Sequence, residues 1–233
     1  MSSKVAIVSP AEWQKARAEL LKQEKTATHL LADISTSRRD LPVVRIDDPA
    51  RFKFDTLDGE KSLVDLFDGR RQLILYHFML KPDDKEGCVG CSFLMDHIPN
   101  LGHLWSRDTS FVAVAQAPIQ KVEAFKQRMG WTFPFYSSGK TFEAVDAAGE
   151  EVTWKPGNGY FGISVFLREG DEVFHTYSTT DRGVEILLST YGLLDMTPLG
   201  RQEVGLASFA LLYLKQQSKW EQAPTYMEIT VDE

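Results

Sequence analysis

Hydrophobic and polar positions change their period along the chain, and each change predicts an element. Between residues 10 and 39, apolar side chains recur every three or four positions, which predicts one long helix. Ser9 and Glu12 have the spacing of a helix-capping box, and the residue before Pro42 is disfavoured in a helix. The apolar stripe of this helix has to cover another surface, either its own domain or a second copy of the chain.

Beyond residue 42 the pattern alternates between strands and helices. Apolar runs predict strands at 43–46, 52–54, 72–78, 111–115, 163–167 and 172–177. Helical spacing predicts a helix from Cys88 to Trp105 with a kink at Pro99, and further helices at 118–129, 183–191 and 203–217. Residues 137–160 are turn-rich and are expected to be irregular.

The run at 72–78 is too apolar for a strand with one solvent-exposed face, so we expect it in the centre of the sheet, covered on both sides. Strands that alternate with helices indicate an α/β fold, with a central mixed β-sheet flanked by helices. We divide the chain into an N-terminal helical extension at 1–42, an α/β domain at 43–192 and a C-terminal helical extension at 193–233.

Composition narrows the classes of protein. Hydrophobic residues make up 43% and charged residues 25% of the chain, which is ordinary for a soluble globular protein. The formal net charge of −7 argues against a nucleic-acid binder and against an anionic membrane surface, because both attract Lys and Arg. No apolar run is long enough to span a membrane or to form the core of a signal peptide, so a cytoplasmic location is expected.

The strongest chemical signal is the sequence Gly87-Cys-Val-Gly-Cys91, which follows the predicted central strand. Two cysteines three positions apart at the start of a helix can close a disulfide, and the free amides of the first turn favour a thiolate on the first one. Cys91 begins the apolar stripe of the predicted helix. This pattern predicts an attacking thiolate at Cys88 and a shielded resolving thiol at Cys91. The alternative is an inert pair, since cysteine is a common small core residue.

Charges next to the pair do not decide how it ionises. Asp83, Asp84 and Glu86 would raise the pKa of a nearby thiol, whereas Lys81 and Lys85 would lower it. The helix terminus favours the thiolate, and the balance of these effects stays open.

Metal binding is a second chemical use for these cysteines. Zinc needs three or four protein ligands, and Cys91, His97 and His103 do not share a face of the predicted helix, so a zinc site is not expected. Copper(I) requires only two thiolates with an imidazole or thioether nearby. Cys88 and Cys91, with His77 as third ligand, therefore form an alternative copper(I) site. Otherwise no cofactor is expected.

Aromatic and histidine side chains give weaker signals. Tyr76, Trp131 and Tyr136 are candidates for the wall of a cleft, although a core position is more typical of such residues. His77 and His175 lie within predicted strands, where a structural histidine is more common than a catalytic one. The chain lacks the glycine-rich motifs of nucleotide sites, so no nucleotide cofactor is expected.

Four blocks of the sequence together resemble an uncharacterised thioredoxin-like family related to the alkyl hydroperoxide reductase/thiol-specific antioxidant group. The blocks are Tyr76-His-Phe-Met79, Gly87-Cys-Val-Gly-Cys-Ser-Phe93, Gly130-Trp-Thr-Phe-Pro-Phe-Tyr-Ser-Ser138 and Thr197-Pro-Leu-Gly-Arg-Gln-Glu203. Residues 57–78 resemble the first part of such a domain, and the likeness covers about residues 10–203. The resemblance implies a thioredoxin-like fold and says little about function.

The motif departs from the best-known relatives of that fold. Thioredoxins are expected to have Trp-Cys-Gly-Pro-Cys and a cis-proline facing the cysteines, whereas here Gly87 precedes Cys88 and the matching strand begins Tyr160-Phe-Gly-Ile-Ser164. Peroxiredoxins have proline and threonine where this chain has Lys81 and Lys85. These departures argue against the usual thioredoxin and peroxidase activities, and they keep a non-catalytic binding module as an alternative.

The function that these observations predict is a thiol–disulfide oxidoreductase that uses the Cys88–Cys91 pair. Its expected partners are a disulfide, peroxide or other sulfur-containing substrate and a cellular thiol reductant, with no nucleic acid and no membrane. A homodimer, if one forms, is expected to use the N-terminal helix or the C-terminal extension.

Overall fold

A computed structural model describes residues 6–156 and 161–202 of the protein. The chain divides into two compact units, one of residues 1–42 and one that begins at Val43. The first contains helix α1 (Pro10–Arg39), which starts with a reciprocal cap. Ser9 Oγ accepts a hydrogen bond from the Glu12 amide, and the Glu12 carboxylate accepts one from the Ser9 amide at 2.9 Å. The predicted helix and its capping box are confirmed, while the surface that its stripe covers stays a prediction.

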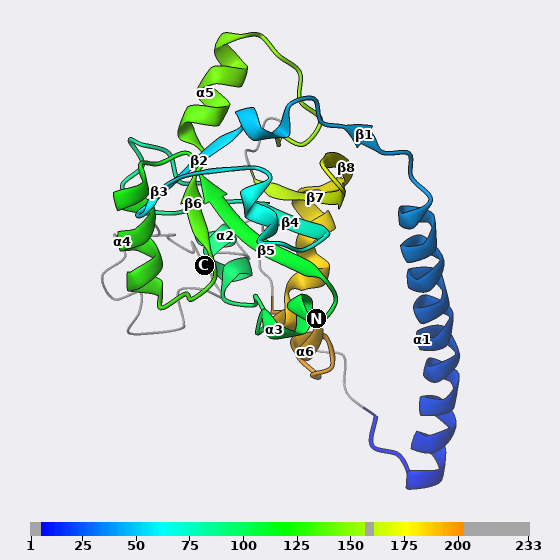
Figure 1. Ribbon diagram of the computed structural model, residues 1–233. Helices are drawn as coiled ribbons and strands as arrows, with labels where there is room; N and C mark the ends of the chain where they lie inside the picture. Colours follow the sequence, from blue (N-terminus) through cyan, green and yellow to red (C-terminus); the bar gives the residue numbers. More distant parts are fainter. Residues whose placement is uncertain (1–5, 157–160, 203–233) are drawn as a thin grey trace. The chain divides into compact units, whose positions relative to one another are not determined.

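The second unit is built around a mixed sheet, which has eight strands in the described residues (Figure 1). In space the strands follow the order β1-β8-β7-β4-β5-β6-β2-β3. They are β1 (Val44–Arg45), β2 (Lys53–Thr56), β3 (Gly59–Ser62), β4 (Gln72–His77), β5 (Thr109–Ala115), β6 (Phe135–Ser137), β7 (Gly162–Glu169) and β8 (Glu172–Thr179). Strands β4, β5 and β6 run parallel, and the strands outside them pair antiparallel.

Strand β4 lies in the interior of the sheet, as its apolar sequence predicts. It pairs in parallel with β5, where Leu75 is opposite Val112, and antiparallel with β7, where Leu75 is opposite Ser164. Leu73, Leu75 and Tyr76 are completely buried. The order β8-β7-β4-β5, with an antiparallel hairpin next to two parallel strands, is that of a thioredoxin-like fold. The predicted fold class is therefore confirmed.

Helices cover both faces of this sheet. In the described residues of the second unit, the α-helices are α2 (Val89–Met95), α3 (Gly102–Trp105), α4 (Ile119–Met129), α5 (Gly139–Ala147) and α6 (Ser189–Asp195). Three 3₁₀ helices in the described residues are η1 (Pro49–Arg51), η2 (Asp65–Phe67) and η3 (Asp181–Leu187). In the described ranges, no helix combines the length and the apolar character that crossing a bilayer requires.

The helix predicted from Cys88 to Trp105 is wrong as a single element. Helix α2 ends at Met95, and α3 begins only beyond Pro99, which has no amide hydrogen to continue the ladder. Ile98 and Leu101, beyond the first helix, are still partly buried against the core, whereas Trp105 is 48% exposed.

Other helix predictions differ in detail from the structure. The predicted helix at 183–191 is the 3₁₀ helix η3 followed by α6. Residues 137–160 were expected to be irregular, yet α5 occupies part of that range. The helix predicted at 203–217 lies outside the described residues.

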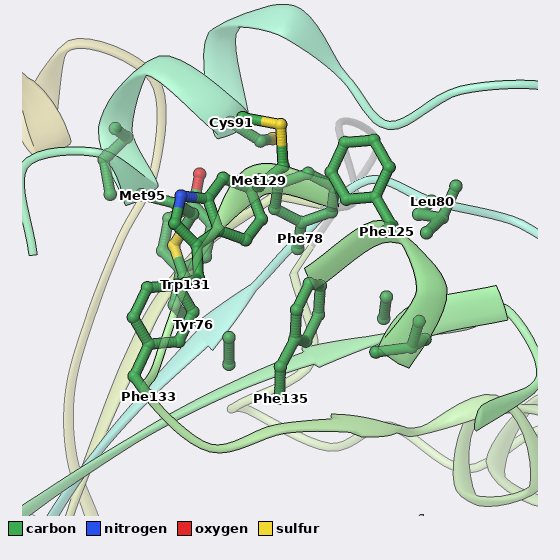
Figure 2. Close-up of a cluster of buried hydrophobic side chains, with 14 of the residues drawn as sticks. Tyr76, Phe78, Leu80, Cys91, Met95, Phe125, Met129, Trp131, Phe133 and Phe135 are labelled. Carbon is green, nitrogen blue, oxygen red and sulfur yellow. The ribbon is translucent and has the colours of Figure 1, made fainter. Parts of the chain in front are cut away.

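Two hydrophobic cores lie on opposite faces of the sheet. Neighbouring residues of a strand point to opposite faces, so Tyr76 of β4 belongs to one core and Leu75 to the other. We call the first the cysteine-side core; it includes Cys91 and a group of aromatic rings (Figure 2). Side chains of α2 and α4 complete it. We call the second the far core; it is completed by side chains of α5 and by Trp154.

Candidate active site

Cys88 is positioned by a loop that returns to the end of the central strand. The Cys88 amide donates a hydrogen bond to the carbonyl of Met79, just past β4, at 3.0 Å. The Cys88 carbonyl accepts hydrogen bonds from the Ser92 amide and hydroxyl, both at 2.9 Å. These contacts make Cys88 the N-cap residue of α2 and hold it beside the point where the chain leaves the sheet.

The residue before Cys88 is glycine because a larger one would not fit. A Cβ atom on Gly87 would lie 2.6 Å from Phe125 Cζ and 2.8 Å from Phe78 Cε1. Both rings are buried in the cysteine-side core, so they have little room to move. Gly87 thus allows the loop to lie directly on the aromatic rings.

The half-buried Cys88 thiol lies where a negative charge is stabilised. Its Sγ accepts a hydrogen bond from the Cys91 amide at 3.4 Å. The facing Cys91 thiol, followed by the amides of Cys91 and Gly90, lowers the pKa of Cys88 to about 7. Burial and the charge of Asp84 act in the opposite direction but are outweighed.

The Cys91 thiol has a very different environment. It is 3% exposed, and burial raises its pKa well above the usual value. Tyr76 lies beneath it, fully buried, with a hydroxyl that makes no hydrogen bond of normal geometry among the described residues. The hydroxyl is nevertheless close enough to Cys91 to lower the pKa of that thiol in part. Both cysteines are free, so the pair is in its reduced form.

Both thiols border a cleft of about 280 Å³. Its apolar lining comes from the end of β4, from α2, from the residue before β7 and from η3, and consists of Tyr76, Met79, Leu94, Phe161 and Val184. Three charged side chains of η3 complete it: Asp181, Arg182 and Glu185. The cleft can therefore hold a small molecule in contact with Cys88.

The structure brings only one of the three predicted wall residues to this cleft. Tyr76 lines it, whereas Trp131 is buried in the cysteine-side core and its Nε1 donates to Asp96 Oδ1 at 2.8 Å. Tyr136 packs against the far core, on the other face of the sheet. Tyr136 belongs to β6, which β5 separates from β4 in the sheet order.

His77 is not brought to the cysteines either. Its ring packs against Phe142 and Trp154 of the far core, and its Nε2 lies 3.0 Å from Ser164 Oγ. Burial lowers the pKa of His77 to about 3, so the ring is neutral. The strand alternation that turns Tyr76 toward the cysteines turns His77 away from them. A third copper ligand at His77 is therefore not supported by the geometry.

Two further observations bear on histidines and metals. His175 Nε2 lies 2.7 Å from Ser178 Oγ, within the β7–β8 hairpin, which is a structural environment. Among residues 6–156 and 161–202, no three or more His, Cys, Asp or Glu side chains come together as a metal site.

Several cleft residues carried no signal in the sequence. Val184 and the charged side chains of η3 belong to no motif, and they reach the cysteines only through the fold. Phe161 could have been found, because the resemblance placed the strand that starts near it opposite the cysteine pair.

Comparison with protein families matches residues 2–226 to the family described as "Bacterial protein of unknown function (DUF899)". The chain belongs to the DUF899 family. A search of curated proteins found no match. The family assignment therefore comes without an activity, and the site has to be interpreted from its own geometry.

Solved structures similar to this DUF899 chain include two peroxiredoxins. A PrxQ mutant from Xylella fastidiosa is 16% identical, with a TM-score of 0.40, 65% of this chain covered and 94% of that one. Peroxiredoxin Q from Xanthomonas campestris is 16% identical, with a TM-score of 0.40 and coverages of 65% and 96%. A putative protein disulfide isomerase from Bacteroides thetaiotaomicron is 17% identical, with a TM-score of 0.39 and coverages of 65% and 92%. At such low identity their activities do not transfer to this chain.

Proposed function

We propose that this protein is a thiol–disulfide oxidoreductase in which Cys88 attacks and Cys91 resolves. The observation that carries the proposal is the contrast between two neighbouring thiols on one cleft. Cys88 is accessible and has a pKa of about 7, whereas Cys91 is buried and has a raised pKa. At neutral pH the accessible sulfur is therefore partly a thiolate, which is the nucleophilic form, and the buried sulfur keeps its proton.

The proposed reaction consumes one disulfide. The Cys88 thiolate attacks one sulfur of the substrate, the substrate S–S bond breaks, and the other half leaves as a thiolate that takes up a proton. Cys91 then loses its proton and attacks Cys88 Sγ, which releases the second half as a thiol and leaves a Cys88–Cys91 disulfide. Two electrons pass from the protein to the substrate, and a cellular dithiol reductant returns them.

A peroxide substrate would use the same two sulfurs. Attack of Cys88 on the peroxide would break the O–O bond, release an alcohol or water and leave a sulfenic acid. Cys91 would condense with this group, expelling water and forming the same disulfide. Both reactions predict an oxidised pair that differs from the reduced protein by two hydrogens.

The test compares single variants in the full chain. With a disulfide substrate, Cys91→Ser should accumulate a mixed disulfide at Cys88, and Cys88→Ser should accumulate none, as read from intact mass. The wild-type pair should titrate reversibly in glutathione buffers, at a potential in the range of thioredoxin-like proteins, about −270 to −120 mV. A Cys88→Ser protein that turns over normally, or a folded wild type that never forms the disulfide, would refute the proposal.

Copper(I) binding is the second candidate because Met79 lines the cleft together with both thiols. Two thiolates and a thioether are ligands that suit copper(I). Under strictly anaerobic, reducing conditions this candidate predicts one copper per chain, bound more weakly by Met79→Leu. Absence of copper binding removes it, and catalytic turnover without metal favours the oxidoreductase. If both assays fail and a partner still binds a variant with both cysteines changed to alanine, the chain is a non-catalytic binding module.

A further inference from the structure

We infer that the cleft beside Cys88 selects small substrates that are apolar next to the reacting sulfur and carry no negative charge. This inference rests on the proposed function and names its substrate class. It follows from the lining of the cleft and from the charges at its edge.

The lining next to the thiols is mostly carbon. Met79, Leu94, Phe161 and Val184 face the same space as Cys88. Leu94 and Val184 are held in the cysteine-side core, so this part of the wall is preformed. A volume of about 280 Å³ is close to the lower end of typical small-molecule sites, about 300–1,000 Å³, and suits one short alkyl or aryl arm of a disulfide.

The charges at the edge disfavour an anion. Arg182 lies 3.2 Å from a carboxylate oxygen of Glu185, and Arg201 lies 3.7 Å from another. The lining itself therefore carries two carboxylates and one guanidinium, which is paired with one of them. Asp181 also lines the cleft, and the charge of Asp84 acts on Cys88 in the direction that opposes a thiolate. A substrate carboxylate would lose water and meet these negative charges.

One buried polar group lies next to the reacting pair at the base of the cleft. Tyr76 is fully buried, and its hydroxyl lacks a normal hydrogen bond in the described part of the chain, which is costly for a buried donor. It lies beside Cys91 and lines the cleft. The hydroxyl that acts on the Cys91 thiol therefore lies next to the apolar wall, against which the carbon chain of a substrate would pack.

The experiment uses three disulfides that share a two-carbon arm and differ only in its end group, which is a methyl, a hydroxyl or a carboxylate: dipropyl disulfide, hydroxyethyl disulfide and dithiodipropionate. The reduced full-length protein is mixed with each, quenched with acid and analysed by intact mass. Each rate is divided by the rate of a small free thiol with the same disulfide, which removes intrinsic reactivity. The normalised rate should fall in the order given, by at least about tenfold from the apolar disulfide to the dianion.

Variants separate the two causes of the selectivity. Phe161→Ala should reduce the advantage of dipropyl disulfide several-fold, and Asp181→Asn should raise the rate with dithiodipropionate. Asn tolerates the left-handed backbone of residue 181, where φ is 52°. Asp171→Asn, in the exposed turn between β7 and β8, is the matched control and should change neither rate.

The outcomes distinguish failure of the inferred substrate class from failure of the proposed function. Normalised rates within threefold of one another, or a dianion that reacts fastest through Arg182, overturn the substrate class and leave the oxidoreductase standing. A Cys88 that reacts readily with iodoacetamide but with none of the three disulfides refutes the proposed disulfide reaction itself. A falling order that both cleft variants alter, and the control does not, supports the inference.

Discussion

The Cys91 amide donates a hydrogen bond to Cys88 Sγ at 3.4 Å, so the residue that carries the second thiol also stabilises the first one as a thiolate. This hydrogen bond makes the ionisation of the Cys88 thiol depend on the position of Cys91. Because Cys91 itself is buried and holds its proton, the proposed reaction assigns attack to Cys88 and resolution to Cys91.

The first prediction concerns the pH dependence of alkylation. Cys88 has a pKa of about 7, so its reaction with iodoacetamide should rise with pH and reach half its maximum near pH 7. At pH 7 its thiolate fraction should exceed that of an ordinary thiol, with a pKa of about 8.5, roughly sixteen-fold. Cys91 should react far more slowly. Peptide mapping after timed quenching gives both rates.

The control for this prediction is the same assay in denaturant. Unfolding removes the amide contact and the burial, so the two cysteines should then react at similar rates with an ordinary pH profile. A native Cys88 profile centred near pH 9 would contradict the hydrogen-bond account.

The second prediction isolates the hydroxyl beneath the pair. Tyr76→Phe keeps the buried ring but removes the group that partly lowers the pKa of Cys91. Closure of a mixed disulfide by Cys91 should slow about threefold to tenfold, while alkylation of Cys88 stays unchanged. Tyr136→Phe, on the far-core side, removes a hydroxyl without touching the pair and should alter neither rate. Equal slowing in both variants would assign the effect to general packing.

Much of the fold was predictable because the hydrophobic pattern of the sequence agrees with the way the strands pair in the sheet. The continuous apolar run of β4 indicated an interior strand, and the structure confirms β5 and β7 on either side of it. Helix α5 was missed because its glycine-rich and polar surroundings resemble a loop, whereas Phe142 and Val145 form a stripe only when seen against the far core.

The candidate site was only partly predictable. The spacing of Cys88 and Cys91 pointed to a pair at the start of a helix, and the structure places α2 there. Nearby charges left the thiol's ionisation open, and only the three-dimensional contacts indicate that the Cys91 thiol and the amides outweigh burial and Asp84. His77 was weighed as a ligand because sequence distance says nothing about which face of a strand a side chain occupies.

The third prediction tests the close approach at Gly87. An alanine Cβ would collide with the rings of Phe125 and Phe78, so Gly87→Ala should destabilise the protein by about 1–3 kcal/mol. It should also shift the loop that aligns Cys88 and raise the midpoint of the alkylation profile. Gly192→Ala is the matched control, since no atom lies within 4 Å of its added Cβ. It lies in helix α6 and should leave stability unchanged or raise it by up to about 1 kcal/mol. Urea unfolding measures both, and equal loss in the two variants would contradict the steric account.

The fourth prediction concerns acid stability. Burial lowers the pKa of His77 from 6.5 to about 3, so between these values the unfolded chain binds a proton that the folded protein excludes. Folding should therefore lose stability as pH falls below 6.5, by up to about 1.4 kcal/mol for each pH unit from this residue alone.

His77→Gln offers an amide in place of the ring nitrogen that contacts Ser164 and removes the titration. The variant should start less stable at pH 7, because it loses ring contacts with Phe142 and Trp154, but its stability should decline less steeply toward pH 4. His103→Gln, at an exposed position, should follow the wild type. Urea unfolding at several pH values measures the slopes. Parallel slopes for wild type and His77→Gln would mean that the ring is protonated in the folded protein, and with it that the far core admits a charge beneath the central strand.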